Sequence, residues 1–252
     1  MNRTRLAWLS PLALLSSCGG AEEQAPAPTP STFASEPAMA EPSATAAPEP
    51  DLAACPKALA NEERMRSTPL AIPAAFGRAK ADLDHIAVAA ESGNTLCVDT
   101  SWIEEIVSPR ASADGRFLSF AWHGYESFGH VLIDRSGEGQ VIDTGETPRA
   151  SPSGRRFAAV DLGEAGFGAL NAFGVWDVRQ VGLRQIAKVS EGLPSGDWRL
   201  AGWQGEDCVR LALLPSDRLP EDVADLDRAP RDPWFASESN AWKPLPGSCP
   251  GA

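Results

Sequence analysis

The chain has little of the chemistry on which most enzyme sites are built. Its 252 residues include three histidines and a single tyrosine. It contains no Cys-x-x-Cys pair, so we expect no bound metal, and we expect no other cofactor. The Gly-x-Ser-x-Gly elbow of serine hydrolases, the phosphate-binding loop and the dinucleotide fingerprint are also missing. Nucleophilic catalysis and nucleotide binding therefore find little support in the sequence.

Positive charge is scarce as well. The chain holds 22 Lys and Arg against 34 Asp and Glu, which gives a formal net charge of −12. An acidic surface repels phosphate backbones, so we expect no nucleic acid partner. Much of the acid lies in residues 217–232, which also contain several prolines. Carboxylates there do not alternate around a glycine turn as in calcium loops, so we interpret this segment as a solvated loop.

The N-terminal apolar run is too short to cross a bilayer, which takes roughly 20 apolar residues. Leu6–Leu15 follows two basic residues, Arg3 and Arg5, and precedes small residues. A basic start, a short apolar run and a small-residue end are typical of a secretory signal. The sequence therefore predicts export, with residues 1–17 as the signal peptide.

The end of this signal has a specific pattern, Leu15-Ser16-Ser17-Cys18. It resembles the lipobox of bacterial lipoproteins, in which the cysteine is lipidated and the peptide is cut just before it. The resemblance implies that acyl chains such as palmitate on Cys18 anchor the protein in a lipid bilayer of the cell envelope. In such lipoproteins an aspartate directly after the cysteine retains the protein in the inner membrane. This chain has Gly19 there, so the resemblance implies an anchor at the periplasmic face of the outer membrane. A chance cysteine after an ordinary signal peptide is the alternative.

Residues 18–50 predict a tether that does not fold. The segment after Gly19 consists almost entirely of Ala, Pro, Glu, Ser and Thr, with Phe33 as its one aromatic residue. Such a chain buries too little apolar surface to offset its ordering entropy. Repeated proline favours extended conformations of about 3.1 Å per residue, so the tether reaches on the order of 90 Å. Residues 51–252 remain as a single β-rich extracytoplasmic domain.

Four cysteines remain once Cys18 is assigned to lipid. An even number in an exported chain predicts disulfides, for which three pairings exist. We favour Cys55–Cys97 and Cys208–Cys249, because each joins nearby segments at one end of the domain. Each bond closes a loop of roughly forty residues and stabilises the fold by about 3–4 kcal/mol in the chain-entropy model.

The middle of the chain repeats itself. Ser112–Phe120 recurs about 40 residues later as Ser151–Ala159, and a looser copy spans Ser195–Trp203. Each copy opens with a turn of small polar residues, where glycine supplies a positive φ, and continues as an apolar strand. Further strands are expected at 129–134, 140–143, 173–178, 183–187 and 208–214.

A turn followed by three strands, repeated about every 40 residues, resembles the blades of TolB-like and WD40-like β-propellers. The resemblance implies an all-β, mainly antiparallel fold: a propeller or an incomplete propeller-like meander. The helix-forming residues of Cys55–Met65 predict a short helix before it. A propeller needs about four blades or more, and three copies are visible. Ile86–Ala89 and Thr95–Val98 are candidate strands for a fourth. A meander that curls into a sandwich is the alternative.

One connection is dense in polar and aromatic residues, Trp122–His130. His123, Glu126 and His130 are the candidate catalytic residues, because His and Glu can act as acid and base. Their spacing matches no helical metal motif, and a packed hairpin is the other interpretation. Glu104 and Glu105 are further acids that a two-carboxylate hydrolase would use.

Tryptophan is abundant, with eight residues in the chain. Five fall in or beside expected strands, and we expect them in the core rather than stacked on sugar rings: Trp102, Trp122, Trp176, Trp198 and Trp203. Trp234 and Trp242 lie in proline-rich surroundings, where we expect partial exposure. The leading functional hypothesis is a non-enzymatic module that binds an envelope protein or glycan. The competing hypothesis is an envelope glycan hydrolase or lyase.

Overall fold

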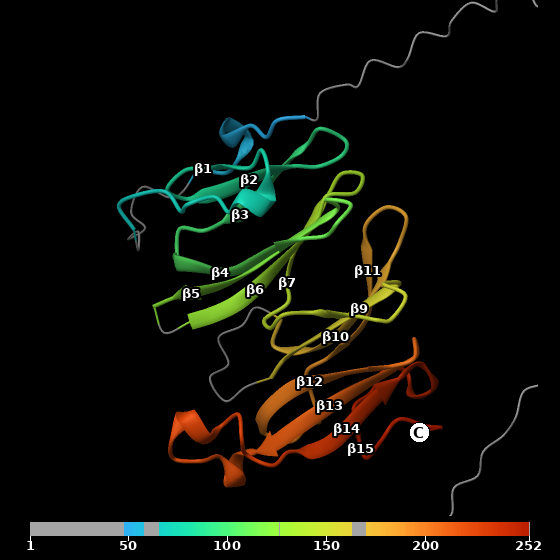
Figure 1. The fold of residues 1–252 in the computed structure, drawn as a ribbon. Coiled ribbons are helices and arrows are strands. Elements are labelled where there is room, and N and C mark those ends of the chain that lie inside the picture. Colours follow the sequence, from blue (N-terminus) through green and yellow to red (C-terminus); the bar gives the residue numbers. More distant parts are fainter. Residues whose placement is uncertain (1–47, 58–65, 126, 163–169, 252) are drawn as a thin grey trace, which may run out of the picture. The chain divides into compact units, whose positions relative to one another are not determined.

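The computed structural model describes residues 48–57, 66–125, 127–162 and 170–251, and this part of the chain is all-β (Figure 1). Its strands form four antiparallel sheets that follow one another along the sequence. In each sheet, strands that are consecutive in sequence pair with one another, so each sheet is an up-and-down meander. This is the propeller-like arrangement that the repeats predict. None of the described residues forms a helix long and apolar enough to cross a membrane.

The first sheet supplies the fourth repeat unit that the sequence only suggested. It contains β1 (Lys80–Ala81), β2 (His85–Ala89) and β3 (Thr95–Asp99). The second sheet contains β4 (Ile103–Ala111), β5 (Phe117–Gly124), β6 (Ser127–Asp134) and β7 (Gln140–Asp143).

The third and fourth sheets complete the domain. The third contains β8 (Arg149–Ala150), β9 (Arg156–Asp161), β10 (Ala172–Val178) and β11 (Leu183–Val189). The fourth contains β12 (Gly196–Gln204), β13 (Cys208–Pro215), β14 (Asp232–Ser237) and β15 (Leu245–Pro246). Short 3₁₀ turns lie in the connections: η1 (Leu52–Ala54), η2 (Ala74–Phe76), η3 (Ser216–Arg218), η4 (Val223–Asp225) and η5 (Glu238–Asn240). The segment from η3 to η4 is largely exposed, as expected for the acidic loop.

The repeated turns have the structure that their residues predict. The N–H of Gly115 donates to the carbonyl of Ser112, and the N–H of Gly154 donates to the carbonyl of Ser151, both at 2.9 Å. Gly115 and Gly154 have φ of 70° and 71°, which residues with a Cβ rarely adopt. In both copies the serine hydroxyl also accepts a backbone N–H five residues later. The same local chemistry therefore starts β5 and β9.

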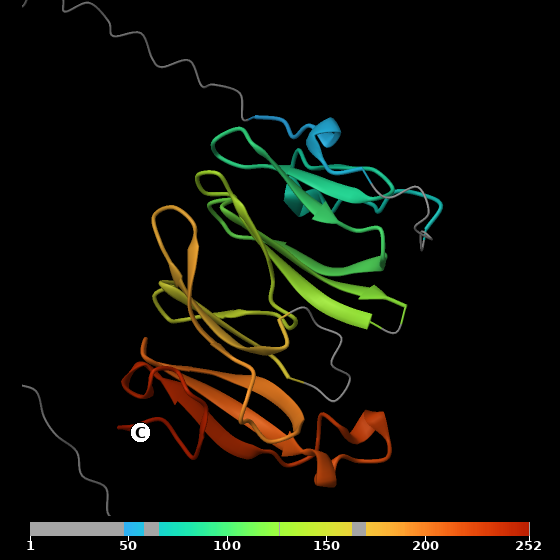
Figure 2. The same cartoon turned by 180° about the vertical axis from the view of Figure 1, so that it is seen from behind.

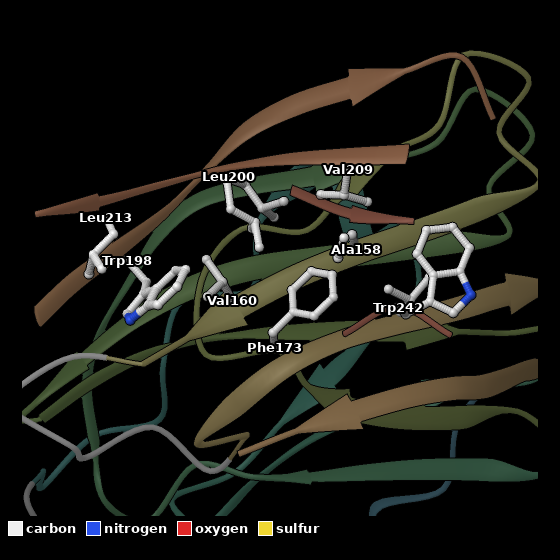
Figure 3. Close-up of a cluster of buried hydrophobic side chains, with 11 residues drawn as sticks. Ala158, Val160, Phe173, Trp198, Leu200, Val209, Leu213 and Trp242 are labelled. Carbon is white, nitrogen blue, oxygen red and sulfur yellow. The ribbon is translucent and has the colours of Figure 1, made fainter. Parts of the chain in front are cut away.

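Figures 1 and 2 show the four sheets following one another in chain order, and three hydrophobic clusters join neighbouring sheets. Strand alternation explains how one strand serves two clusters, because successive side chains point to opposite faces. In β10, Phe173 and Val175 pack toward the fourth sheet, whereas Ala172 and Trp176 pack toward the second. Figure 3 shows Phe173 and Val160 of the third sheet beside Trp198 and Leu200 of the fourth. No cluster of the described residues joins the first sheet to the fourth.

Polar bonds reinforce these junctions. Arg116 donates from Nε and Nη2 to the buried carboxylate of Asp134, both at 2.9 Å, and from Nη2 to the carbonyl of Gly182 in the third sheet at 3.3 Å. Glu206, between β12 and β13, accepts the hydroxyl of Ser151 at 2.8 Å and the N–H of Ser153 at 2.7 Å. The repeated turn of the third sheet is thereby bound to the fourth.

Two disulfides close the ends of the domain, and they are the pairs favoured from the sequence. Cys55–Cys97 connects the chain after η1 to β3, and Cys208–Cys249 connects β13 to the C-terminal segment. Both bonds lie in terminal sheets, the first and the fourth.

Some expectations fall outside the described residues or are wrong. The expected helix at Cys55–Met65 lies mostly at 58–65, outside the described part, as do the signal and tether up to residue 47. Cys55 itself is extended (φ −74°, ψ 147°), because Pro56 follows and disfavours the helical region.

The burial of the tryptophans differs in part from the expectation. Trp122, Trp176 and Trp198 are buried as expected, and Trp203 is partly buried, but Trp102 is 39% exposed because it lies in the connection before β4. Trp234 is partly buried, in line with the expectation. Trp242 is buried rather than exposed, because its ring packs against Trp203 and under the guanidinium of Arg156.

Candidate functional site

A cleft of about 570 Å³ lies where three separate parts of the domain meet. The second sheet contributes Arg110 from β4, His123 from β5, and Phe128 and His130 from β6. The connection from β7 to β8 contributes residues 145–148, β8 contributes Arg149, and β12 contributes Arg199 and Leu200. We call it the β5–β6 cleft.

Strand register places the second-sheet residues on one face. His123 pairs with Phe128, Ala121 pairs with His130, and Arg110 pairs with Ser119. Directly paired residues of antiparallel strands share a face, and so do residues two apart in one strand. The intervening residues Phe120 and Trp122 pack in the cluster with the first sheet, although Trp122 also borders the cleft. Alternation in β5 and β6 therefore separates a polar cleft face from an apolar core face.

His130 is a buried, neutral part of the cleft wall. Its side chain is 2% exposed, and its Nδ1 lies 2.9 Å from the hydroxyl of Thr144. The Thr144 hydroxyl also donates to backbone carbonyls, so it accepts from His130 when Nδ1 carries the proton. Burial, with a smaller contribution from nearby Arg110, lowers the pKa of His130 to about 4. This imidazole is therefore uncharged at neutral pH.

Glu146, in the connection from β7 to β8, also lines the cleft. Burial, with repulsion from Asp197 next, raises the pKa of its carboxyl to about 7, although Arg199 opposes the shift. Arg199 is itself bound to Asp197 at 3.2 Å and to Asp227 at 2.5 Å. Glu146 is thus a carboxyl that gains and loses its proton near neutral pH.

The mouth of the cleft carries cationic side chains. Arg110 and Arg149 are exposed, and neither guanidinium has an ion-pair partner among the described residues. This contrasts with Arg116, Arg156 and Arg231, which are bound to carboxylates. His123 is also exposed at the mouth. In a chain of net charge −12, the free guanidinium groups of Arg110 and Arg149 therefore make the cleft a place that favours anions.

The cleft brings together only some of the residues that the sequence proposed. His123 and His130 both line it, whereas Glu126 lies outside the described residues. Glu104 and Glu105 are exposed on β4 and are not among the lining residues, although Glu105 pairs with His123 and so shares its face of the sheet. The sequence did not single out Glu146, Arg110, Arg149 or Arg199, which come from different repeats. No group of three or more His, Cys, Asp or Glu in the described part of the chain is placed to hold a metal.

Replacing Glu146 with glutamine is expected to change how stability depends on pH. An unfolded glutamate titrates near 4.5 and the folded one near 7, so the folded state holds more protons between these values. Stability of the wild type therefore falls as the pH rises through this interval. Glu146→Gln removes the loss, so the variant should be roughly 2–3 kcal/mol more stable than the wild type at pH 8 and about equal at pH 4.

Urea unfolding at both pH values measures this difference. The matched control is Glu104→Gln, which alters an exposed carboxyl on β4 and should change stability little at either pH. A Glu146→Gln variant that is no more stable than the wild type at pH 8 would contradict the assignment of a buried, near-neutral carboxyl.

Comparison with known proteins gives limited similarity. No protein-family model and no curated protein matches the chain. Among solved structures, TolB from Acinetobacter baumannii is similar, with a TM-score of 0.32 and 12% identity over 66% of this chain and 38% of that chain. The β-propeller domain of the Trilobed protease from Pyrococcus furiosus has a TM-score of 0.31 and 12% identity over 58% of this chain and 43% of that chain. The chain thus covers well under two thirds of either protein.

Proposed function

We propose that this protein is a lipid-anchored component of the cell envelope whose β domain binds a partner molecule through the β5–β6 cleft. Export is supported by the signal-like N-terminus and by two disulfides in the folded part. Anchoring is supported by the match of Leu15–Cys18 to the lipobox. The partner is a protein or a glycan of the envelope, held away from the bilayer by the tether.

The observation that carries the binding role is the composition of the cleft. The cleft is open to solvent, and side chains from three parts of the domain line it. Two of these side chains, Arg110 and Arg149, have guanidinium groups with no ion-pair partner among the described residues. Hydrolysis of a glycan would require two carboxylates facing each other, about 5–10 Å apart. Among the described residues that line the cleft, Glu146 is the one carboxylate. The geometry therefore supports binding better than two-carboxylate hydrolysis.

Photo-cross-linking in intact envelopes tests this function. A photoreactive phenylalanine analogue replaces Phe128, which is 53% exposed at the cleft. We expect a defined cross-linked product that disappears when Arg110→Gln and Arg149→Gln are combined with the probe. Arg210→Gln is the matched control, because it removes an exposed arginine on β13, away from the cleft. The absence of any product, or a product unaffected by the cleft variants, would count against the binding role.

A further inference from the structure

The chemistry of the β5–β6 cleft restricts the partner that it can bind. Arg110 and Arg149 lie on different sheets, in β4 and β8, and both line the cleft. Guanidinium groups bind carboxylates through paired, charge-assisted hydrogen bonds. Neither group is neutralised by a carboxylate of the described residues, so a ligand that supplies anionic groups at two points would complete the site.

An exposed aromatic ring adjoins these charges. Phe128 is 53% exposed and pairs with His123 on the cleft face of the second sheet. Tyr125, at the tip of the same β5–β6 hairpin, is 70% exposed. Large apolar rings left in water beside a polar cleft mark a contact surface rather than a core. Such a ring offers a flat face on which a ligand with its own flat, weakly polar face can stack.

The strand edges near the cleft are poorly suited to backbone pairing with an extended peptide. β4 is an edge strand, but its register shifts between Val107 and Arg110. Ser108 has φ of 50° and Pro109 lacks an N–H, so the regular ladder is interrupted there. β8, the edge of the third sheet, is only two residues long. β12, the edge of the fourth sheet that also lines the cleft, has a register shift between Leu200 and Gly202. Recognition at this cleft therefore depends on side chains, not on adding a strand.

We propose that the β5–β6 cleft binds an acidic glycan, a carboxylated sugar chain whose carboxylates contact Arg110 and Arg149 and whose ring face stacks on Phe128. This assignment rests on the proposed binding function and names its ligand class. A sugar chain presents flat ring faces and carboxylates on one rigid backbone, and it needs no strand edge. Those properties match the free guanidinium groups, the exposed ring and the interrupted edges.

The test uses the full chain, exported and purified in detergent, with binding measured by calorimetry at low salt. The probes are a short oligogalacturonate, its neutral methyl ester, and an oligoglutamate peptide of similar charge. We expect the oligogalacturonate to bind, the ester to bind at least about tenfold more weakly, and the peptide to bind more weakly than the sugar acid.

Variants connect this binding to the cleft. Arg110→Gln combined with Arg149→Gln should weaken oligogalacturonate binding about tenfold or more, and Phe128→Ser should weaken it several-fold. Arg210→Gln should leave the affinity unchanged. All of these side chains are exposed, so thermal unfolding should show the variants folded like the wild type.

Three results would overturn the proposal: equal binding of acid and ester, preferential binding of the peptide, or no binding of the oligogalacturonate. If one of these occurs while the cross-link at Phe128 still depends on the two arginines, the ligand class is wrong and the binding function stands. If the cross-link is also absent, the proposed function itself fails.

Discussion

Replacing Cys18 with alanine is expected to move the full-length protein from the membrane fraction to the soluble fraction. Each buried methylene of an acyl chain contributes about 0.8 kcal/mol, and more than one chain gives stable attachment. The remainder of the chain is acidic, and an acidic surface is repelled by anionic lipids. Loss of Cys18 therefore removes the one anchor that the sequence predicts.

Fractionation with a carbonate wash measures this release, and mass spectrometry of the N-terminal peptide reports acylation and cleavage. Ser17→Ala is the matched control, because it keeps a small residue before Cys18 and should leave the protein acylated and membrane-bound. A Cys18→Ala protein that has lost its signal peptide and still resists the carbonate wash would contradict the lipid anchor.

Removing the Cys208–Cys249 bond is expected to destabilise the domain by about 4 kcal/mol. The bond joins residues 41 apart in sequence, and the open chain gains the freedom that this loop closure restricts. It also holds the C-terminal segment, whose last strand, β15, has only two residues. For a domain of this size the melting temperature should fall by roughly 10 °C.

The variant for this test carries both Cys208→Ala and Cys249→Ala, so that no free thiol is left at either position. The pair Cys55→Ala and Cys97→Ala is a matched comparison, because its loop spans 42 residues and the expected loss is similar. Calorimetric melting under non-reducing conditions measures both. An unchanged melting temperature in the first variant would show that the bond does not hold the fourth sheet.

The repeats predicted the strands that adjoin the repeated turns well, because local sequence patterns specify them. β5, β6, β9 and β10 each contain apolar runs next to a turn, and the structure places them where the patterns indicate. β4 and β14 were missed for physical reasons. β4 contains Glu104, Glu105 and Pro109, and most of its residues are exposed, so it lacks the alternation of a half-buried strand. β14 begins at Asp232 and contains Pro233, next to the acidic loop, and its sequence is typical of a connection.

The cleft was only partly predictable, because it is assembled from residues far apart in sequence. His123 and His130 lie in one dense hairpin and could be recognised as a group. Glu146 gave no signal, because its raised pKa arises from burial and from Asp197, which is about 50 residues away in sequence. Arg110 and Arg149 are marked out by lining one cleft without a carboxylate partner among the described residues, which only a three-dimensional arrangement reveals.

The chain-ordered clusters have a consequence for how the protein opens. Because no hydrophobic cluster of the described residues joins the first sheet to the fourth, each terminal sheet is supported by one neighbour, whereas each middle sheet is supported by two. The two disulfides lie in the terminal sheets. Covalent bonds thus reinforce the places where noncovalent cooperativity is weakest. In a reducing environment, amide hydrogens should exchange first in β2–β3 and β13–β15 and last in β5–β6 and β9–β10. Oxidation of the two cysteine pairs would then complete the fold from its ends.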